Sequence, residues 1–183
     1  MSFDEIKAFI TNKFGEAVLV REQRQELMSY LVIQTDQIAA VCAELHAYEQ
    51  LYFDVLSCQT GMDNGPAAGT LEVAYNLYSI PYNHQVCLKV VVNRNSADEP
   101  LPVVPTVSHI WRTADWHERE IFDLLGIQFS GHPDMRRILC AADWEGYPLR
   151  KDYEAQEYYH GIRVAFDEHN RNNGFKGEDW QNN

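Results

Sequence analysis

Three acidic residues, Glu118, Glu120 and Asp123, lie close together in the sequence and could form a general acid and base pair. Neighbouring carboxyl groups raise one another's pKa, which is how such pairs hold a proton for catalysis. On a helix, however, positions 118 and 120 point apart, and Arg119 is spaced to meet Asp123 at i, i+4. We therefore favour ion pairs at an interface over catalysis. A solvated helix face is the plainer alternative.

His117 and His132 could bind a metal ion together with Asp134 or Asp123. The HExxH spacing of a helical zinc site is absent, and Pro133 fixes the backbone beside His132. The sequence therefore favours a histidine at position 132 that stabilises a turn, hydrogen-bonded to a carboxylate or a carbonyl.

A basic cluster follows, and it could grip a phosphate or a nucleotide. Its members are Arg136, Arg137, Arg150 and Lys151. The glycine-containing segment 61–65 has neither Rossmann nor P-loop spacing, so nothing supports nucleotide binding. Guanidinium groups pair well with carboxylates, so we expect docking to acidic or C-terminal groups of a partner, or internal pairing with Asp143 and Asp152. If Arg136 or Arg150 holds a buried carboxylate, truncation to alanine should cost about 2–5 kcal/mol.

Aromatic residues accompany these charges and could anchor a protein interface. They are Trp111, Trp116, Trp144, Tyr147, Tyr153, Tyr158 and Tyr159. For the tryptophans, packing beneath a loop is an equally good interpretation. For Tyr158 and Tyr159 that interpretation is weaker, because they follow the expected end of the core.

A short helix must position the acidic residues. Asp115 could cap it, Glu118 could be the reciprocal acid of a capping box, and Gly126 would end it. Ile121, Leu124 and Leu125 then share one apolar face. Between this helix and position 153 little is periodic, so the backbone and charges there need partners within the domain or on another chain.

The composition limits the partners of the chain. Its formal net charge is -12 and its pI about 4.9, which argues against nucleic acid and against direct binding to an anionic membrane. The N-terminus has no signal-peptide pattern, and the apolar residues 86–92 are too few to span a bilayer, so we expect a cytoplasmic chain. The cysteines are scattered without a C-x-x-C pair, so we expect reduced core thiols and no metal site; they are Cys42, Cys58, Cys87 and Cys140.

Hydrophobic periodicity predicts an α+β fold. We expect a helix from a Ser2/Glu5 capping box to Gly15, extended segments at 17–20 and 27–33 around a turn at 21–25, a second helix capped by Asp36, and strands at 52–58, 71–78 and 86–92. The prediction is a two-layer domain of helices on a mixed β-sheet, ordered α-β-β-α-β-β-β, then a helix and an extended C-terminal arm. We divide it into a core domain at 1–110, a docking segment at 111–153 and an extended or flexible tail at 154–183.

Several motifs carry a family resemblance. They are Glu118-Arg119-Glu120, Asp123-Leu124-Leu125, His132, Arg136, Ile138, Leu139 and the run DWEGYPLRKDY. Together they resemble the C subunit of NADH-quinone oxidoreductase, which is the 30 kDa subunit of respiratory complex I. The likeness extends over residues 53–153. Tyr147 stands where the family usually has histidine, and Glu154 where it has proline.

The resemblance implies a structural and assembly subunit in the peripheral arm of proton-translocating NADH:quinone oxidoreductase, on the cytoplasmic side of the bacterial inner membrane. It implies no cofactor on this chain: FMN, iron-sulfur clusters and quinone would belong to partners, chiefly the 49 kDa subunit and its iron-sulfur neighbours. The implied contact residues are Glu118, Arg119, Glu120, Asp123, His132, Arg136, Arg137, Trp144, Arg150, Lys151 and Asp152. The equivalent subunit of a membrane-bound hydrogenase, or of a ferredoxin- or F420-dependent quinone reductase, is the alternative.

Overall fold

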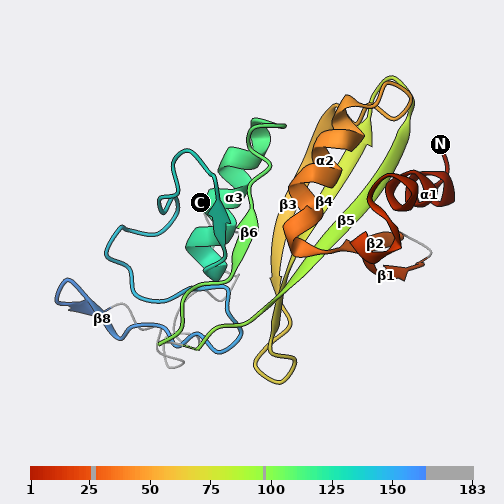
Figure 1. The fold of residues 1–183 in the computed structure, drawn as a ribbon. Helices are drawn as coiled ribbons and strands as arrows, with labels where there is room; N and C mark the ends of the chain where they lie inside the picture. Colours follow the sequence, from red (N-terminus) through yellow and green to blue (C-terminus); the bar gives the residue numbers. More distant parts are fainter. Residues whose placement is uncertain (26–27, 97, 164–183) are drawn as a thin grey trace, which may run out of the picture. The chain divides into compact units, whose positions relative to one another are not determined.

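A five-stranded sheet forms the centre of the chain, shown in the computed structural model of Figure 1, which describes residues 1–25, 28–96 and 98–163. The strands are β1 (Leu19–Gln23), β2 (Tyr30–Ile33), β3 (Val55–Asp63), β4 (Thr70–Ser79) and β5 (His84–Asn93). Their order is β1-β2-β5-β4-β3, with β2 and β5 parallel and the other neighbours antiparallel. The predicted mixed sheet is confirmed. The first hairpin differs in detail, because residues 21–23 continue β1 where a turn was expected.

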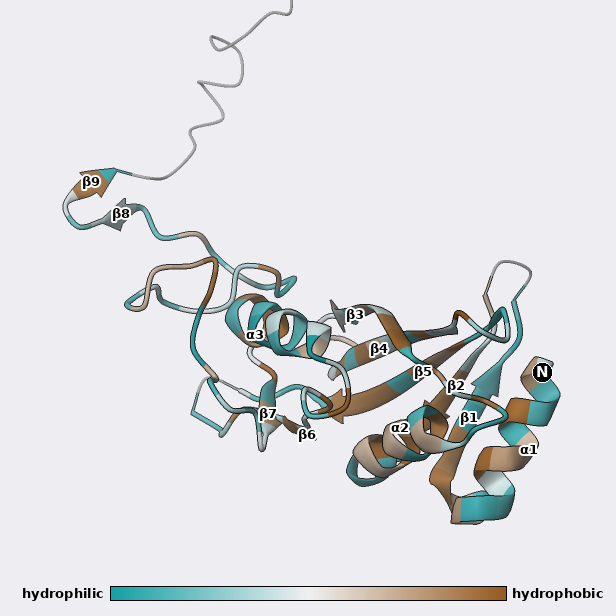
Figure 2. Cartoon of the chain, turned by 90° about the horizontal axis from the view of Figure 1, so that it is seen from above, coloured by the Kyte–Doolittle hydropathy of each residue, from teal (hydrophilic) through white to brown (hydrophobic). Residues whose placement is uncertain are grey.

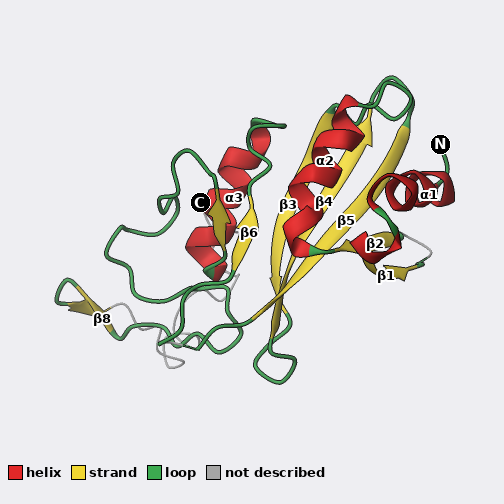
Figure 3. Ribbon diagram, in the orientation of Figure 1, coloured by secondary structure: helices red, strands yellow, loops and turns green. Residues whose placement is uncertain are grey.

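Three helices share one core with this sheet. They are α1 (Phe3–Phe14), α2 (Ile38–Ala47) and α3 (Thr113–Leu125). Ile10 of α1, Val41 of α2 and Ile121 of α3 belong to the same buried cluster as Leu88 of β5. Figure 3 shows α1 and α2 lying against the strands. The predicted two-layer α+β architecture is therefore confirmed.

The local signals for the first two helices differ in accuracy. The Ser2 hydroxyl accepts from the backbone N–H of Glu5, whose side chain accepts from the Ser2 N–H, so the predicted capping box is present. Helix α2 forms as predicted and buries Ile38, Val41, Cys42 and Leu45, but the expected Asp36 cap is wrong. A 3-10 turn at Thr35–Gln37 precedes the helix, and Gln37 occupies the N-cap without a side-chain hydrogen bond.

The strand faces alternate as the sequence predicts. Tyr75 of β4 pairs with Leu88 of β5, and both are fully buried beneath the helices. On the other face Glu72 and Lys89 form an ion pair of 3.0 Å, and the Lys89 ammonium lies over the Tyr30 ring. Figure 2 shows the apolar and polar residues along these strands.

A second, smaller sheet positions α3. Strands β6 (Val103–Pro105) and β7 (Gln128–Ser130) pair in parallel and are joined by α3, which gives a β-α-β unit. Beyond β7 the chain is irregular up to Tyr153, where the first compact unit, Met1–Tyr153, ends.

The second unit begins at Glu154. Its described part contains a hairpin of β8 (Tyr158–Tyr159) and β9 (Ile162–Arg163), whose turn residues His160 and Gly161 both have positive φ. The predicted tail begins at residue 154, and its residues 164–183 lie outside the described part of the chain.

Close packing of α3 on β3 depends on Gly61. A Cβ atom there would lie 2.4 Å from Leu125 Cδ1 and 2.9 Å from Ile121 Cγ2. We expect Gly61→Val to lower the free energy of unfolding by about 1–3 kcal/mol, because the buried side chains of Leu125 and Ile121, or the helix that carries them, would have to shift. Urea denaturation measures the effect, with Thr60→Val, an exposed neighbour on the opposite face, as the control. Equal stability of the two variants would contradict this packing.

Candidate functional site: a loop pinned by buried carboxylates

Residues 131–153, here called the pinned loop, follow β7 without helix or strand. A loop of this length and irregularity needs side chains to satisfy its backbone. Two buried carboxylates and a helix end supply those partners.

Asp123 is the first anchor of the pinned loop. It is fully buried on α3, and its Oδ2 accepts from the backbone N–H groups of Ile138, Leu139 and Cys140 at 3.0, 2.6 and 2.8 Å. Its Oδ1 accepts from Arg137 Nη1 at 2.7 Å. Burial alone would raise the pKa of Asp123, but these donors outweigh it and hold the pKa below its usual value.

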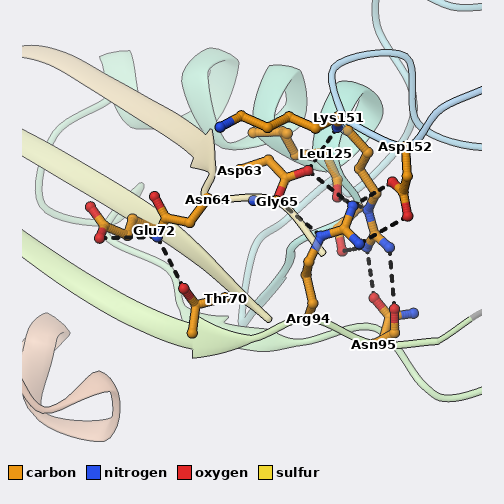
Figure 4. A network of polar contacts seen from close by, with 12 residues as sticks. Asp63, Asn64, Gly65, Thr70, Glu72, Arg94, Asn95, Leu125, Lys151 and Asp152 are labelled. Carbon is orange, nitrogen blue, oxygen red and sulfur yellow. Dashed lines mark hydrogen bonds and ion pairs between the residues drawn. The ribbon is translucent and has the colours of Figure 1, made fainter. Parts of the chain in front are cut away.

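Asp63, at the end of β3, is the second anchor (Figure 4). Arg94 grips both of its oxygens, with Nε–Oδ1 and Nη2–Oδ2 distances of 2.9 Å, and the Lys151 N–H donates to Oδ2 at 2.8 Å. Burial raises the pKa of Asp63, but the Arg94 guanidinium and the backbone donors lower it by more. The pKa of Asp63 is therefore below its usual value. Arg94, which directly follows β5, also binds Asp152 and so holds the end of the loop beside that strand.

The C-terminal end of α3 is the third anchor. Gly126 follows it in the left-handed conformation with φ of 69°. Arg150 Nε donates to the Leu125 carbonyl at 2.8 Å, and its Nη2 donates to Asn95 Oδ1 at 2.6 Å. A cation at the negative end of a helix is electrostatically favourable. The Tyr147 ring lies close to Gly126, and the Arg150 guanidinium is 4.9 Å from the ring centroid.

His132 stabilises a turn, as predicted. Its Nδ1 accepts from the Asp134 N–H at 3.0 Å, so the proton of the neutral ring lies on Nε2, which donates to the Asp115 carbonyl at 3.1 Å. No group of three or more metal-binding side chains was found among the described residues.

Several expectations for α3 are wrong. The helix begins at Thr113, so Asp115 lies inside its first turn and Glu118 is no capping-box acid. Arg119 does not pair with Asp123: it donates to the carbonyls of Arg136 and Arg137. Tertiary partners have replaced the local ones because Asp123 faces the loop.

The remaining predicted residues occupy different environments. Glu120 is exposed, and Trp144 Nε1 donates to the Tyr153 hydroxyl at 3.0 Å. Among the described residues, neither Arg136 nor Arg150 holds a buried carboxylate: Arg136 is 75% exposed and pairs with the partly exposed Asp134, and Arg150 binds the Leu125 carbonyl and the Asn95 amide. The arginines that do so are Arg137 and Arg94.

Sequence reasoning missed Asp63, Arg94 and Asn95. Their signal is that Asp63-Asn64 and Arg94-Asn95 each end an extended run with two polar residues. Only the sheet register brings the two ends together, because Asp63 pairs with Leu71 and Leu71 with Val92.

The pinned loop also presents apolar side chains to solvent. Leu139 is 65% exposed and Leu149 57% exposed, while Trp116 of α3 is 63% exposed beneath the Arg119 guanidinium. The fold and loop thus define a class of protein: a small α+β domain that holds a long ordered loop with exposed apolar groups, suited to protein binding.

Comparison with known proteins identifies the family. The family model "Respiratory-chain NADH dehydrogenase, 30 Kd subunit" matches residues 31–159. The NADH-quinone oxidoreductase C subunit of Chloroherpeton thalassium is 44% identical over 158 residues, which cover 86% of this chain and 63% of the relative. The C subunit of the same enzyme from Chlorobium phaeobacteroides is 40% identical over 158 residues, covering 86% and 92%. The chain belongs to the family of the 30 kDa subunit of respiratory-chain NADH dehydrogenase, as its sequence predicted.

A solved structure supports the fold. A chain in the structure of the membrane-bound sulfane sulfur reductase, an archaeal respiratory membrane complex, superposes with a TM-score of 0.59 at 24% identity. The match covers 82% of this chain and 85% of the other. In the described part of this chain, no helix is long and apolar enough to cross a membrane.

Proposed function

We propose that this chain is a structural and assembly subunit, with no active site of its own, in the peripheral arm of a proton-translocating NADH:quinone oxidoreductase. One observation carries the proposal: buried carboxylates hold an irregular loop whose Leu139 and Leu149 side chains face solvent. A loop ordered before binding loses less conformational entropy when a partner docks, so its binding free energy is more favourable.

The division of labour follows from the family. Electrons would pass from NADH through FMN and iron-sulfur clusters on other subunits to quinone, and this chain would hold those subunits in register. Its chief partner would be the 49 kDa subunit with its iron-sulfur neighbours, on the cytoplasmic side of the bacterial inner membrane. Membership of the family and the composition, with net charge -12, support contact with the membrane only through partners.

The contact residues are also part of the proposal. Of the sequence-predicted set, Asp123, Arg137, Arg150 and Asp152 would act indirectly, because their side chains hold the pinned loop. Direct contact falls to exposed groups: Leu139, Leu149 and Arg136 on the loop and Trp116 on α3. Leucine and tryptophan side chains gain binding free energy when a partner buries them, and arginine is enriched at interfaces.

Substitution of an exposed leucine tests this assignment. We expect Leu139→Asp to change the stability of the isolated chain by less than about 0.5 kcal/mol, because the side chain is 65% exposed. In gently solubilised membranes, however, the tagged variant should recover at least about tenfold less of its companion subunits, since a charge would be buried at the contact.

The matched control is Ile80→Asp, the same type of change on a 62% exposed residue in the turn between β4 and β5. The control should co-purify with companions as the parent does. Equal recovery with Leu139→Asp would refute the docking role of the pinned loop. Companions typical of a hydrogenase, without NADH-driven activity, would select the alternative complex.

A further inference from the structure

Among the described residues of the first unit, Glu118 differs from the other two buried carboxyl groups, Asp63 and Asp123. It is fully buried on α3, yet no lysine, arginine or histidine among the described residues forms an ion pair with it. Asp63 and Asp123 each bind an arginine and two or three backbone N–H groups. An ionised carboxylate buried without a cation is strongly disfavoured, and a neutral acid is the usual alternative.

The hydrogen bonds around Glu118 fit a neutral acid. Its Oε1 accepts from the Val107 N–H at 2.8 Å, and its Oε2 contacts Thr106 Oγ1. The Thr106 hydroxyl has one hydrogen but also lies 2.9 Å from Ser108 Oγ, and it accepts from the Ser108 N–H at 3.1 Å. A protonated Glu118 can donate to Thr106 while Thr106 donates to Ser108, and an ionised Glu118 would accept from Thr106 instead. Complete burial without a cation therefore decides in favour of the neutral acid.

The other groups that face Glu118 supply no positive charge. Asp115 of α3 raises its pKa, and Cys42 of α2 and Tyr75 of β4 are buried close enough to feel its charge. The Gln59 amide of β3 is buried near Glu118 and Tyr75, but its atoms make no hydrogen bond of good geometry. Burial is the largest effect and raises the pKa of Glu118 to about 7, although Thr106, Val107 and Gln59 lower it.

We propose that Glu118 is a protonated carboxylic acid in the folded chain, that it donates a hydrogen bond to Thr106, and that loss of this proton loosens α3 from residues 106–107. The proton would pass to solvent as the pH rises above neutrality. Helix α3 also carries Asp123, which holds the pinned loop. Loosening α3 would therefore loosen the loop, and its effect on docking rests on the function proposed above. The protonation itself does not.

The dependence of stability on pH tests the proposal in the purified full-length chain. The pKa of Glu118 is raised from 4.5 to about 7 on folding, so between these values the folded chain keeps a proton that the unfolded chain has released. Stability from this group is therefore complete below pH 4.5 and is lost as the pH rises to about 7. The Tm of the parent should fall about 5–10 °C more between pH 5 and pH 7.5 than that of Glu118→Gln.

Glutamine is the right replacement because it keeps the oxygen facing Val107 and presents a neutral donor to Thr106. Glu120→Gln is the matched control, since Glu120 is exposed on the same helix, and it should follow the parent. Parallel Tm curves for the parent and Glu118→Gln would overturn the proposal. The histidines are common to both chains, so their titration cancels in the comparison.

A direct measurement covers the case in which Glu118→Gln does not fold. Carbon-13 NMR of the parent, labelled at glutamate side-chain carboxyl carbons, follows each group as the pH is changed. One buried carboxyl should titrate near neutrality, well above the rest. Titration of every glutamate below pH 5 would overturn the proposal.

Discussion

Replacing Asp123 by alanine is expected to lower the free energy of unfolding by about 3–5 kcal/mol, because a buried ion pair loses one partner and the other stays buried. Arg137 is the cation left behind. The backbone N–H groups of Ile138, Leu139 and Cys140 lose their acceptor as well. The loop should then open without unfolding the sheet, whose strands make no hydrogen bond to Asp123.

Hydrogen exchange separates this local effect from general instability. In Asp123→Ala the amides of residues 138–140 should exchange at least about a hundredfold faster, while those of β4 and β5 follow only the change in global stability. Glu120→Ala, an exposed carboxylate on the same helix, is the control and should leave both regions protected. Unchanged protection at residues 138–140 would show that Asp123 does not hold the loop.

The pH dependence of this anchor has a definite sign. The pKa of Asp123 is lowered on folding, so its stabilising effect is present above the unfolded pKa of 3.8 and is lost as the pH falls through the lower folded pKa. Glu118 acts in the opposite direction and at higher pH. Acid should therefore release the loop through Asp123, in a pH range where Glu118 remains protonated.

Arg94→Ala should cost a similar amount, about 3–5 kcal/mol, since it strands the carboxylate of Asp63, whose side chain is only 1% exposed. The same substitution removes the partner of Asp152, so residues at the end of the pinned loop should also lose protection. A lysine ammonium cannot make the paired hydrogen bonds that the Arg94 guanidinium makes to Asp63. Arg94→Lys should therefore retain less than half of the stability that Arg94→Ala loses.

Guanidinium chloride denaturation measures the loss of stability in Arg94→Ala and in Arg94→Lys. The control is Arg136→Ala, which removes an arginine whose side chain is 75% exposed and should change stability by less than about 1 kcal/mol. If Arg94→Ala were as stable as Arg136→Ala, the clamp around Asp63 would contribute nothing. A double substitution of Asp63 and Arg94 should be less harmful than the sum of the single ones.

The sequence predicted the central sheet and the first two helices because their signals are local. Alternation along β4 and β5 and the Ser2 capping box depend on neighbours a few residues away. The β-α-β unit was missed, because β6 and β7 are three-residue strands that pair across the intervening helix, and Pro105 interrupts the β6 pattern. Strands this short have no periodicity in the sequence from which their pairing could be predicted.

The docking role of residues 111–153 stays a prediction, and the sequence did not predict the contacts that hold this segment. The sequence indicated a docking segment rich in arginine and acid, and the structure shows Asp123 and Arg137 paired within it. It gave no sign that Arg119 binds carbonyls or that Glu118 is buried without a cation. Those contacts depend on the orientation of α3 about its axis as it packs against β3, where Gly61 allows the helix to approach closely.

We would purify the tagged chain by affinity from gently solubilised membranes, identify its companions by mass spectrometry and assay the eluate for NADH-driven quinone reduction. This measurement tests whether the chain is a subunit of an assembled NADH:quinone oxidoreductase. We expect companions that bear flavin and iron-sulfur clusters, and NADH-driven quinone reduction in the eluate. Recovery of the folded chain alone, without companions or activity, would contradict this expectation.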